Sequence, residues 1–193
     1  MSELLDIVHN LNRLAELRRA ALLDTPPEEP FDRLTRLATR LCRTPVGLVS
    51  LVDRDRQFFK SVVGLPEPWR SRRETPLSYS FCKHAVARPG EPLIVRDARK
   101  DEMFRDNPAV QELGIVAYAG VPLLLAGQAL GTLCVIDTEP RTWSYDEVEM
   151  LKDLAACAMR EIDLRTRLRE AEEARRKAES RRPPAETPPA IAG

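Results

Sequence analysis

A thiol and one of the chain's two histidines lie close together in the segment SFCKHAV, residues 80–86. Such a pair could serve as a nucleophile and its base, as metal ligands, or as an anchor for a cofactor. The segment reads as a short helix with Ser80 as its N-cap. Residues two positions apart on a helix point about 200° away from each other. Cys82 and His84 therefore cannot pair directly, and we predict neither thiolate catalysis nor a metal site here.

The other three cysteines, Cys42, Cys134 and Cys157, lie in apolar stretches far apart in the sequence. No Cys-x-x-Cys pair occurs, which excludes a zinc knuckle and a thioredoxin-type motif. In a reducing compartment, cysteines of this kind are mostly buried small hydrophobic residues. We therefore expect these three thiols to be buried and slow to react. We expect no catalytic residue, no metal site and no cofactor.

Charge balance and hydropathy exclude several classes of partner. The 193 residues include 30 basic and 30 acidic side chains, so no net field attracts nucleic acid or anionic lipid. No apolar run approaches about 18 residues, the length needed to span a bilayer. The N-terminus is amphipathic and carries acids, unlike a signal or transit peptide. We predict a cytoplasmic protein that binds neither nucleic acid nor membrane.

Helices are predicted at both ends of the chain. Apolar residues at 4-3-4 spacing predict an amphipathic helix within residues 1–24, with the stripe Leu4, Val8, Leu11 and Ala15. A second helix is predicted from Phe31 to about Arg43. A long helix opens at a capping box formed by Ser144 and Glu147 and continues to about Ser180. Its stripe has the same spacing and consists of Leu151, Ala155, Ala158 and Ile162.

Strands are predicted between these helices. Residues 46–53 and 58–64 are rich in β-branched and aliphatic residues and read as a hairpin. LIVRD is a short strand, and two longer strands flank the tight turn at Gly127–Gln128. Five or six strands joined mainly by hairpins and loops favour an α+β domain with a central antiparallel sheet and helices on its faces.

Several segments together resemble the GAF domain family, the small-molecule sensing modules of bacterial signalling proteins. The resemblance is carried by FDRLTRLATRLCRTPVGLVSLVDRDRQFFKS, SFCKHAV, LIVRDARKD and above all YAGVPLLLAGQALGTLCVIDTEPR. It implies a six-stranded antiparallel sheet with the N- and C-terminal helices on one face. On the other face it implies a ligand cavity roofed by about residues 77–120. The residues expected to line that cavity are Phe59, Tyr79, Phe81, Cys82, His84, Phe104 and Tyr118.

The chain does not match the catalytic or chromophore-binding members of that family. Lys83 separates the cysteine from the histidine, which are adjacent in the bilin-binding relatives. The four cysteines do not reproduce the arrangement of the free methionine-sulfoxide reductases. The Asn-Lys…Phe…Asp-Glu signature of the cyclic-nucleotide-binding members is also lacking.

Some residues have two open interpretations. His84 is either a structural residue or a ligand contact, and the Tyr118 hydroxyl either points into the cavity or packs. Gly120 and Gly131 lie in strands, where glycine serves either a close backbone approach or the twist of the sheet. Arginines at positions 70, 72 and 73 either are solvated in a loop or meet an anionic ligand.

The sequence predicts a non-catalytic sensor module of bacterial signal transduction that binds an unidentified small molecule and signals through its terminal helices. The output is expected from a separate protein or from a longer chain of which this is part. A structural dimerisation module without a ligand, and a redox enzyme of the free methionine-sulfoxide reductase type, are the alternatives.

The expected organisation is an N-terminal helix (1–24), the GAF domain (25–165), a projecting helix (166–182) and a disordered tail (183–193). The projecting helix needs a partner, because an isolated helix is marginally stable in water. We expect a parallel homodimer in which the two terminal stripes form a four-helix bundle.

Overall fold

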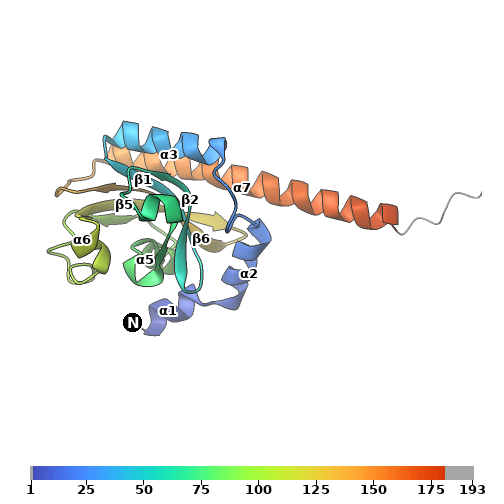
Figure 1. Ribbon diagram of the computed structural model, residues 1–193, viewed down its shortest axis with the longest axis horizontal. Helices are drawn as coiled ribbons and strands as arrows, with labels where there is room; N and C mark the ends of the chain where they lie inside the picture. The colour runs from blue at the N-terminus through green and yellow to red at the C-terminus, as the bar shows by residue number, and fades with distance from the viewer. Residues whose placement is uncertain (1, 181–193) are drawn as a thin grey trace, which may run out of the picture.

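A six-stranded antiparallel sheet forms the centre of the molecule, and its strand order is β3-β2-β1-β6-β5-β4 (Figure 1). The computed structural model describes residues 2–180. The strands are β1 (Val46–Val52), β2 (Arg56–Val63), β3 (Glu74–Pro76), β4 (Leu93–Val95), β5 (Ala117–Leu125) and β6 (Gln128–Asp137). The hairpins β1–β2 and β5–β6 are joined through the β1–β6 ladder. The edge strand β3 was not predicted, because it is a three-residue piece inside an arginine-rich loop.

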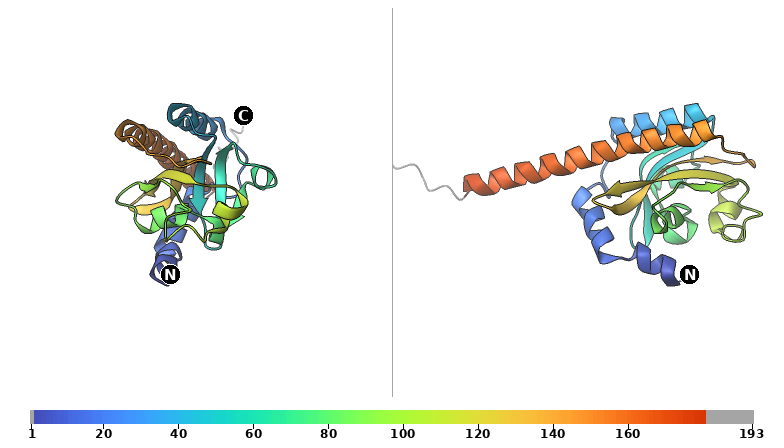
Figure 2. Two further views of the ribbon diagram at one scale, coloured as in Figure 1. Left: turned by 90° about the vertical axis from the view of Figure 1, so that its left-hand side faces the viewer. Right: turned by 180° about the vertical axis from the view of Figure 1, so that it is seen from behind.

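Helices cover both faces of the sheet, so the α+β fold is confirmed (Figures 1 and 2). We call the side covered by α3 and α7 the helix face, and the side covered by α1, α5 and α6 the cavity face. The helices are α1 (Ser2–Val8), α2 (Leu11–Ala20), α3 (Glu29–Cys42), α4 (Trp69–Arg72), α5 (Cys82–Ala87), α6 (Pro108–Glu112) and α7 (Tyr145–Ser180), with the 3-10 turn η1 (Leu77–Tyr79) before α5.

A separate hydrophobic core lies on each face of the sheet. Inward side chains of β1, β5 and β6 pack against α3 and α7 on the helix face. The α7 stripe is buried in this core: Leu151, Ala155, Ala158 and Ile162. The proposal that this stripe contributes to an intersubunit bundle is therefore wrong, because the protomer itself covers it.

The N-terminal segment is two helices, so the prediction of one amphipathic helix over residues 1–24 is wrong. Asn10 ends the first helix by capping the second: its side-chain oxygen accepts from the backbone N–H of Asn12 at 2.9 Å and of Arg13 at 3.2 Å. The break changes the helical phase, so Val8 is buried while Leu11 is 78% exposed. The four-residue stripe is therefore not one surface.

A buried arginine fixes the angle between these two helices. The Arg13 guanidinium donates to the carbonyl oxygens of Val8, Val52 and Ala129, at 2.6–3.3 Å. It thereby ties the end of α1 to β1 and β6. As a result α1 packs against α5 on the cavity face, whereas α2 contacts β6 and α7. The N-terminal helices therefore lie on both sides, not only beside the C-terminal helix.

Helix α7 begins at the predicted capping box and extends well beyond the body of the domain (Figure 1). The Ser144 hydroxyl accepts from the Glu147 N–H at 3.2 Å, and the Glu147 carboxylate accepts from the Ser144 N–H at 2.8 Å. In the second half of α7, Arg169 donates to the backbone carbonyl of Arg19 on α2, and Glu170 accepts from the Arg19 side chain. The predicted disordered tail at 183–193 lies outside the described residues. Within 2–180, no helix is long and apolar enough to cross a membrane.

We predict that Asn10→Ala lowers the free energy of unfolding by about 1 kcal/mol, because two N–H groups at the start of α2 lose their acceptor. Chemical denaturation monitored by circular dichroism measures this change. Asn12→Ala is the matched control, since only the backbone of exposed Asn12 takes part in the cap. Equal effects of the two substitutions would contradict a capping role for Asn10.

Candidate functional site

A small cavity lies on the cavity face, between the sheet and the segment that contains η1, α5 and α6. Five of the seven residues expected to form a ligand site line it: Phe59, Tyr79, Phe81, Cys82 and Tyr118. Its volume is about 20 Å³, which is room for about one water molecule. Ligand pockets commonly measure about 300–1,000 Å³. The expectation of a ligand-sized cavity is therefore wrong for this conformation.

Aromatic side chains fill the space that a ligand would need. Phe81 stacks on Phe104 with ring centroids 4.5 Å apart, and on Tyr118 at 5.4 Å. His84 meets the edge of Phe104 at 4.9 Å. His84 and Phe104 therefore lie behind Phe81 and do not line the cavity. Burial lowers the pKa of His84 to about 4, which keeps the ring neutral at pH 7.

The polar part of the cavity comes from residues that the sequence analysis did not single out. Gln57 and Thr75 line it, and Ser80 donates to the Gln57 side-chain oxygen. The Thr75 hydroxyl is buried without a hydrogen-bond partner. A buried hydroxyl of this kind costs free energy unless a water or ligand satisfies it. Thr75 is therefore a ready contact for a small polar molecule.

Cys82 has a cluster of polar neighbours beneath α5. Its sulfur accepts from the Thr132 hydroxyl at 3.0 Å and from the Tyr118 hydroxyl at 3.3 Å. The Cys134 sulfur is 4.0 Å away. Ser50 is the cross-strand neighbour of Thr132 and is fully buried. We call these five residues the Cys82 cluster.

Strand alternation and one glycine assemble the Cys82 cluster. Thr132 and Cys134 are two positions apart on β6 and therefore point to the same face. A Cβ at Gly120 would lie 2.2 Å from the Tyr118 hydroxyl oxygen. Glycine thus lets the Tyr118 ring lie along the sheet and reach Cys82. Of the two interpretations of Gly120, the structure thus supports a close approach. The same arrangement points the Tyr118 hydroxyl into the Cys82 cluster.

A second glycine sets the distance between the two central strands. A Cβ at Gly131 would lie 1.8 Å from the Ser50 carbonyl oxygen. Gly131 therefore also serves a close backbone approach, here between β6 and β1. This approach brings Ser50 and Thr132 together beneath Cys82.

The cluster makes Cys82 an unusually acidic thiol for a buried residue. Burial raises its pKa, but the hydrogen bonds from Cys134, Thr132 and Tyr118 outweigh burial and lower it to about 7. Burial and the neighbouring Cys82 raise the pKa of Cys134. Burial also raises the pKa of Cys42, to about 11. The prediction that Cys42 and Cys134 are buried is confirmed, whereas the same prediction for Cys157 is wrong. The buried stripe of α7 passes through Ala155 and Ala158, and Cys157 lies outside it on the exposed side of the helix.

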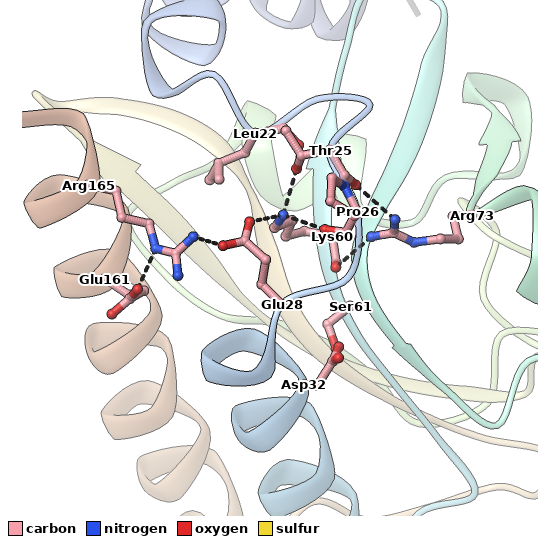
Figure 3. A network of polar contacts seen from close by, with 10 residues as sticks. All are labelled: Leu22, Thr25, Pro26, Glu28, Asp32, Lys60, Ser61, Arg73, Glu161 and Arg165. Atoms are coloured by element: carbon pink, nitrogen blue, oxygen red, sulfur yellow. Dashed lines mark hydrogen bonds and ion pairs between the residues drawn. The ribbon is translucent and has the colours of Figure 1, made fainter. Parts of the chain in front are cut away.

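A second polar network lies on the helix face, centred on Lys60 of β2 (Figure 3). The Lys60 side chain has no exposed surface. Its ammonium donates to the Thr25 hydroxyl at 2.5 Å, to the Pro26 carbonyl at 2.9 Å and to the Glu28 carboxylate. The other oxygen of Glu28 pairs with Arg165 of α7. We call this chain of contacts the Lys60 network.

Strand alternation directs Lys60 toward the helices, and a β-bulge places Ser61 on the same face. In the β1–β2 ladder Val49 pairs with Ser61 and Ser50 pairs with Phe59, so Lys60 is the extra residue. Lys60 and Ser61 then face α3 together, and Ser61 donates to Asp32 at 2.6 Å. Phe59, the residue before the bulge, faces the cavity. Adjacent residues of β2 thus belong to the cavity and to the Lys60 network.

Arg73 completes the Lys60 network from the loop after β2. Its guanidinium donates to the carbonyl oxygens of Thr25 and Lys60, both at 2.8 Å. Arg73 is therefore structural, whereas Arg70 and Arg72 are exposed. A lysine within the apolar run FFKSVV was the sequence signal for this site, and the sequence analysis missed it. Within residues 2–180, no group of three or more His, Cys, Asp or Glu side chains is placed to hold a metal ion.

The family model of the GAF domain matches residues 4–162. The chain belongs to the GAF domain family. The match begins within α1, so it includes much of the segment that the sequence analysis separated as residues 1–24.

Two curated proteins are similar to this GAF domain in sequence. One is a Pseudomonas aeruginosa protein named as a cyclic di-GMP phosphodiesterase, 40% identical over 154 residues, which are 78% of this chain and 25% of that protein. The other is the Escherichia coli K12 protein named phosphoenolpyruvate-dependent phosphotransferase system, 32% identical over 129 residues, 64% of this chain and 17% of that protein. The chain thus spans a quarter or less of these two relatives. Their names support a role in signalling.

A solved structure shows the same fold. The GAF domain of an Acinetobacter phosphoenolpyruvate-protein phosphotransferase superposes with a TM-score of 0.57 at 19% sequence identity. The alignment covers 79% of this chain and 92% of that domain. At this level of identity the likeness concerns the fold alone.

We predict that a bulky thiol reagent labels one of the four cysteines rapidly in the native protein, namely Cys157. The sulfurs of Cys42, Cys82 and Cys134 are buried, so reaction there requires opening of the fold. Labelling with an aromatic disulfide, followed by peptide mapping, tests this. Loss of the rapid phase in Cys157→Ser is expected, whereas rapid labelling of Cys82 would show that the cavity admits large molecules.

Proposed function

We propose that this GAF domain is a regulatory module in which a change at the cavity alters the position or order of α7. The observation that carries the proposal is the adjacency of Phe59 and Lys60 on β2. Phe59 lines the cavity, while Lys60 holds the Glu28–Arg165 pair that attaches α7. Displacement of Phe59 moves the strand that carries Lys60. A packed sheet transmits such a shift because interiors have little free volume.

The molecule that acts at the cavity is a small one, or one that displaces the aromatic residues. Phe81, Phe104 and His84 lie on or next to the short helix α5, so they can move with it. Outward rotation of α5 would open a site lined by Phe59, Tyr79, Phe81, Cys82 and Tyr118, with His84 and Phe104 at its rim. The unpartnered hydroxyl of Thr75 would then supply a hydrogen bond to a polar ligand.

The domain itself is proposed to be regulatory and not catalytic. The similar region of the Pseudomonas relative is a quarter of that protein, so the activity in its name can reside in the remainder. By this account α7 leads to an output domain of a longer chain, or meets a separate output protein, in the cytoplasm. The alternatives of a ligand-free structural module and of a methionine-sulfoxide reductase have no observation here that favours them over a sensor.

We further propose that the module is a homodimer held by α7. A helix of 36 residues is about 54 Å long, and its distal part leaves the domain (Figure 1). Leu164 and Leu168 are one turn apart on α7 and are 58% and 62% exposed. With Cys157 they follow the 3.5-residue period of a coiled-coil seam. A second copy of α7 is the partner that would cover them.

We predict that the full chain has a dimer mass at micromolar concentration and that Leu164→Asp with Leu168→Asp gives a monomer. Two carboxylates in an apolar seam would be desolvated without partners. Light scattering coupled to size exclusion measures the mass. Met103→Asp is the control, because Met103 is 50% exposed and lies in a loop of the cavity face. A monomeric parent, or a double variant that stays dimeric, would contradict this interface.

A further inference from the structure

Cys82 lines the cavity, and Cys134 lies beside it as a second buried, reduced thiol. Their sulfurs are 4.0 Å apart, whereas a disulfide bond measures about 2.05 Å. Cys82 belongs to the six-residue helix α5, and Cys134 to the central strand β6. A movement of α5 toward the sheet by about 2 Å would bring the sulfurs into bonding distance.

We propose that Cys82 and Cys134 form a redox-active dithiol, which a small peroxide that enters the cavity converts into an intramolecular disulfide. Formation of the disulfide depends only on these two thiols and their surroundings. Its use as a signal rests on the function proposed above.

The two thiols have different roles in this reaction. The pKa of Cys82, lowered to about 7, makes a thiolate available near neutral pH, and the thiolate is the nucleophilic form. The raised pKa of Cys134 keeps its proton in place. Cys82 is therefore the residue that reacts with peroxide, and Cys134 is the residue that resolves the product.

The chemistry balances in two steps. First, the Cys82 sulfur attacks one oxygen of hydrogen peroxide. An S–O bond forms, the O–O bond breaks, and the departing oxygen takes up the proton released by Cys82 and leaves as water. The product is a sulfenic acid, with sulfur oxidised by two electrons and peroxide reduced by two. Second, the Cys134 sulfur attacks Cys82: an S–S bond forms, the S–O bond breaks, and hydroxide leaves with the Cys134 proton as water.

The size of the cavity selects the oxidant. Cys82 lines a space of about 20 Å³, which admits a molecule close to water in size. Hydrogen peroxide is of this size, whereas organic hydroperoxides and disulfides such as oxidised glutathione are much larger. The Tyr118 hydroxyl lines the cavity and donates to the Cys82 sulfur, and its oxygen can accept a hydrogen bond from the peroxide. This cavity, which is too small for a typical ligand, thus fits this reagent.

Formation of the Cys82–Cys134 disulfide would affect the helices next to α5. Helix α1 packs against α5, and Arg13 ties the end of α1 to β1 and β6. Helix α2 continues from α1 and contacts α7 through Arg19 and Glu170 at 2.9 Å. A shift of α5 toward Cys134 would thus alter the packing of α1, next to the helices that lead to α7.

The test uses the full chain with Cys157→Ser, which prevents disulfides between molecules. Reduced protein is treated with hydrogen peroxide, quenched, and measured by intact mass and by peptide mapping. We expect the loss of two hydrogen atoms, a Cys82–Cys134 linked peptide, and full reversal by dithiothreitol. Cumene hydroperoxide at equal concentration is expected to react far more slowly, because it does not fit the cavity.

Single variants separate the roles of the two thiols. With Cys134→Ser the reaction should stop at a sulfenic acid on Cys82, which dimedone traps, and with Cys82→Ser the mass should not change. Tyr118→Phe removes only a hydroxyl and should form the same disulfide more slowly. Cys42→Ser is the matched control, since Cys42 is also buried but its pKa is raised, and it should behave like the parent.

Several outcomes would overturn the proposal. They are a folded parent that keeps both thiols under peroxide, a Cys82→Ser variant oxidised as fast as the parent, or a linkage that involves Cys42. Hydrogen exchange of the oxidised and reduced forms then separates the two proposals. A disulfide without any change in the exchange of α1 or α7 would leave the dithiol standing and contradict its use as a signal. If the disulfide does not form, the dithiol proposal is wrong, but the regulatory role proposed for α7 is unaffected.

Discussion

A lysine side chain with no exposed surface is the constraint on which the helix face of this domain depends. Burial lowers the pKa of Lys60 to about 8, with repulsion from Arg73 as a further cause, and a buried cation is costly without partners. The partners come from the loop between α2 and α3 and from Glu28. Glu28 in turn holds Arg165 of α7. Satisfying one ammonium group thus fixes the loop, the start of α3 and the middle of α7 against β2.

The same strand joins the two faces of the sheet. The bulge at Lys60 lets Phe59 reach the cavity while Lys60 and Ser61 reach the helices. On the cavity face, tight packing leaves room for about one water molecule beside Cys82. The domain therefore has little capacity to absorb a change at Cys82 locally. A small chemical event beneath α5, such as the proposed disulfide, can therefore serve as the input of this module, as a larger ligand can.

Local patterns predicted much of the fold, and the exceptions have physical causes. The hairpins and the capping box of α7 follow from alternation and from Ser144 with Glu147, which are local signals. The break at Asn10 was missed because an apolar spacing continued across it by coincidence. At the site, five of seven expected residues line the cavity, whereas its closure depends on the stacking of Phe81 with Phe104, which only tertiary packing decides. The Lys60 network joins residues 137 positions apart, from Glu28 to Arg165, and no local pattern specifies such a pairing.

The most direct test of the central claim is hydrogen exchange of the α7 amides around residues 161–170 in Glu28→Gln. A neutral amide cannot pair with both Lys60 and Arg165 as the carboxylate does. We expect faster exchange in this stretch, equivalent to a loss of about 1–3 kcal/mol of local stability. Glu29→Gln is the matched control, because the exposed Glu29 pairs with surface arginines of α3. Exchange in α7 that is the same in both variants as in the parent would contradict the claim that the Lys60 network attaches α7 to the sheet.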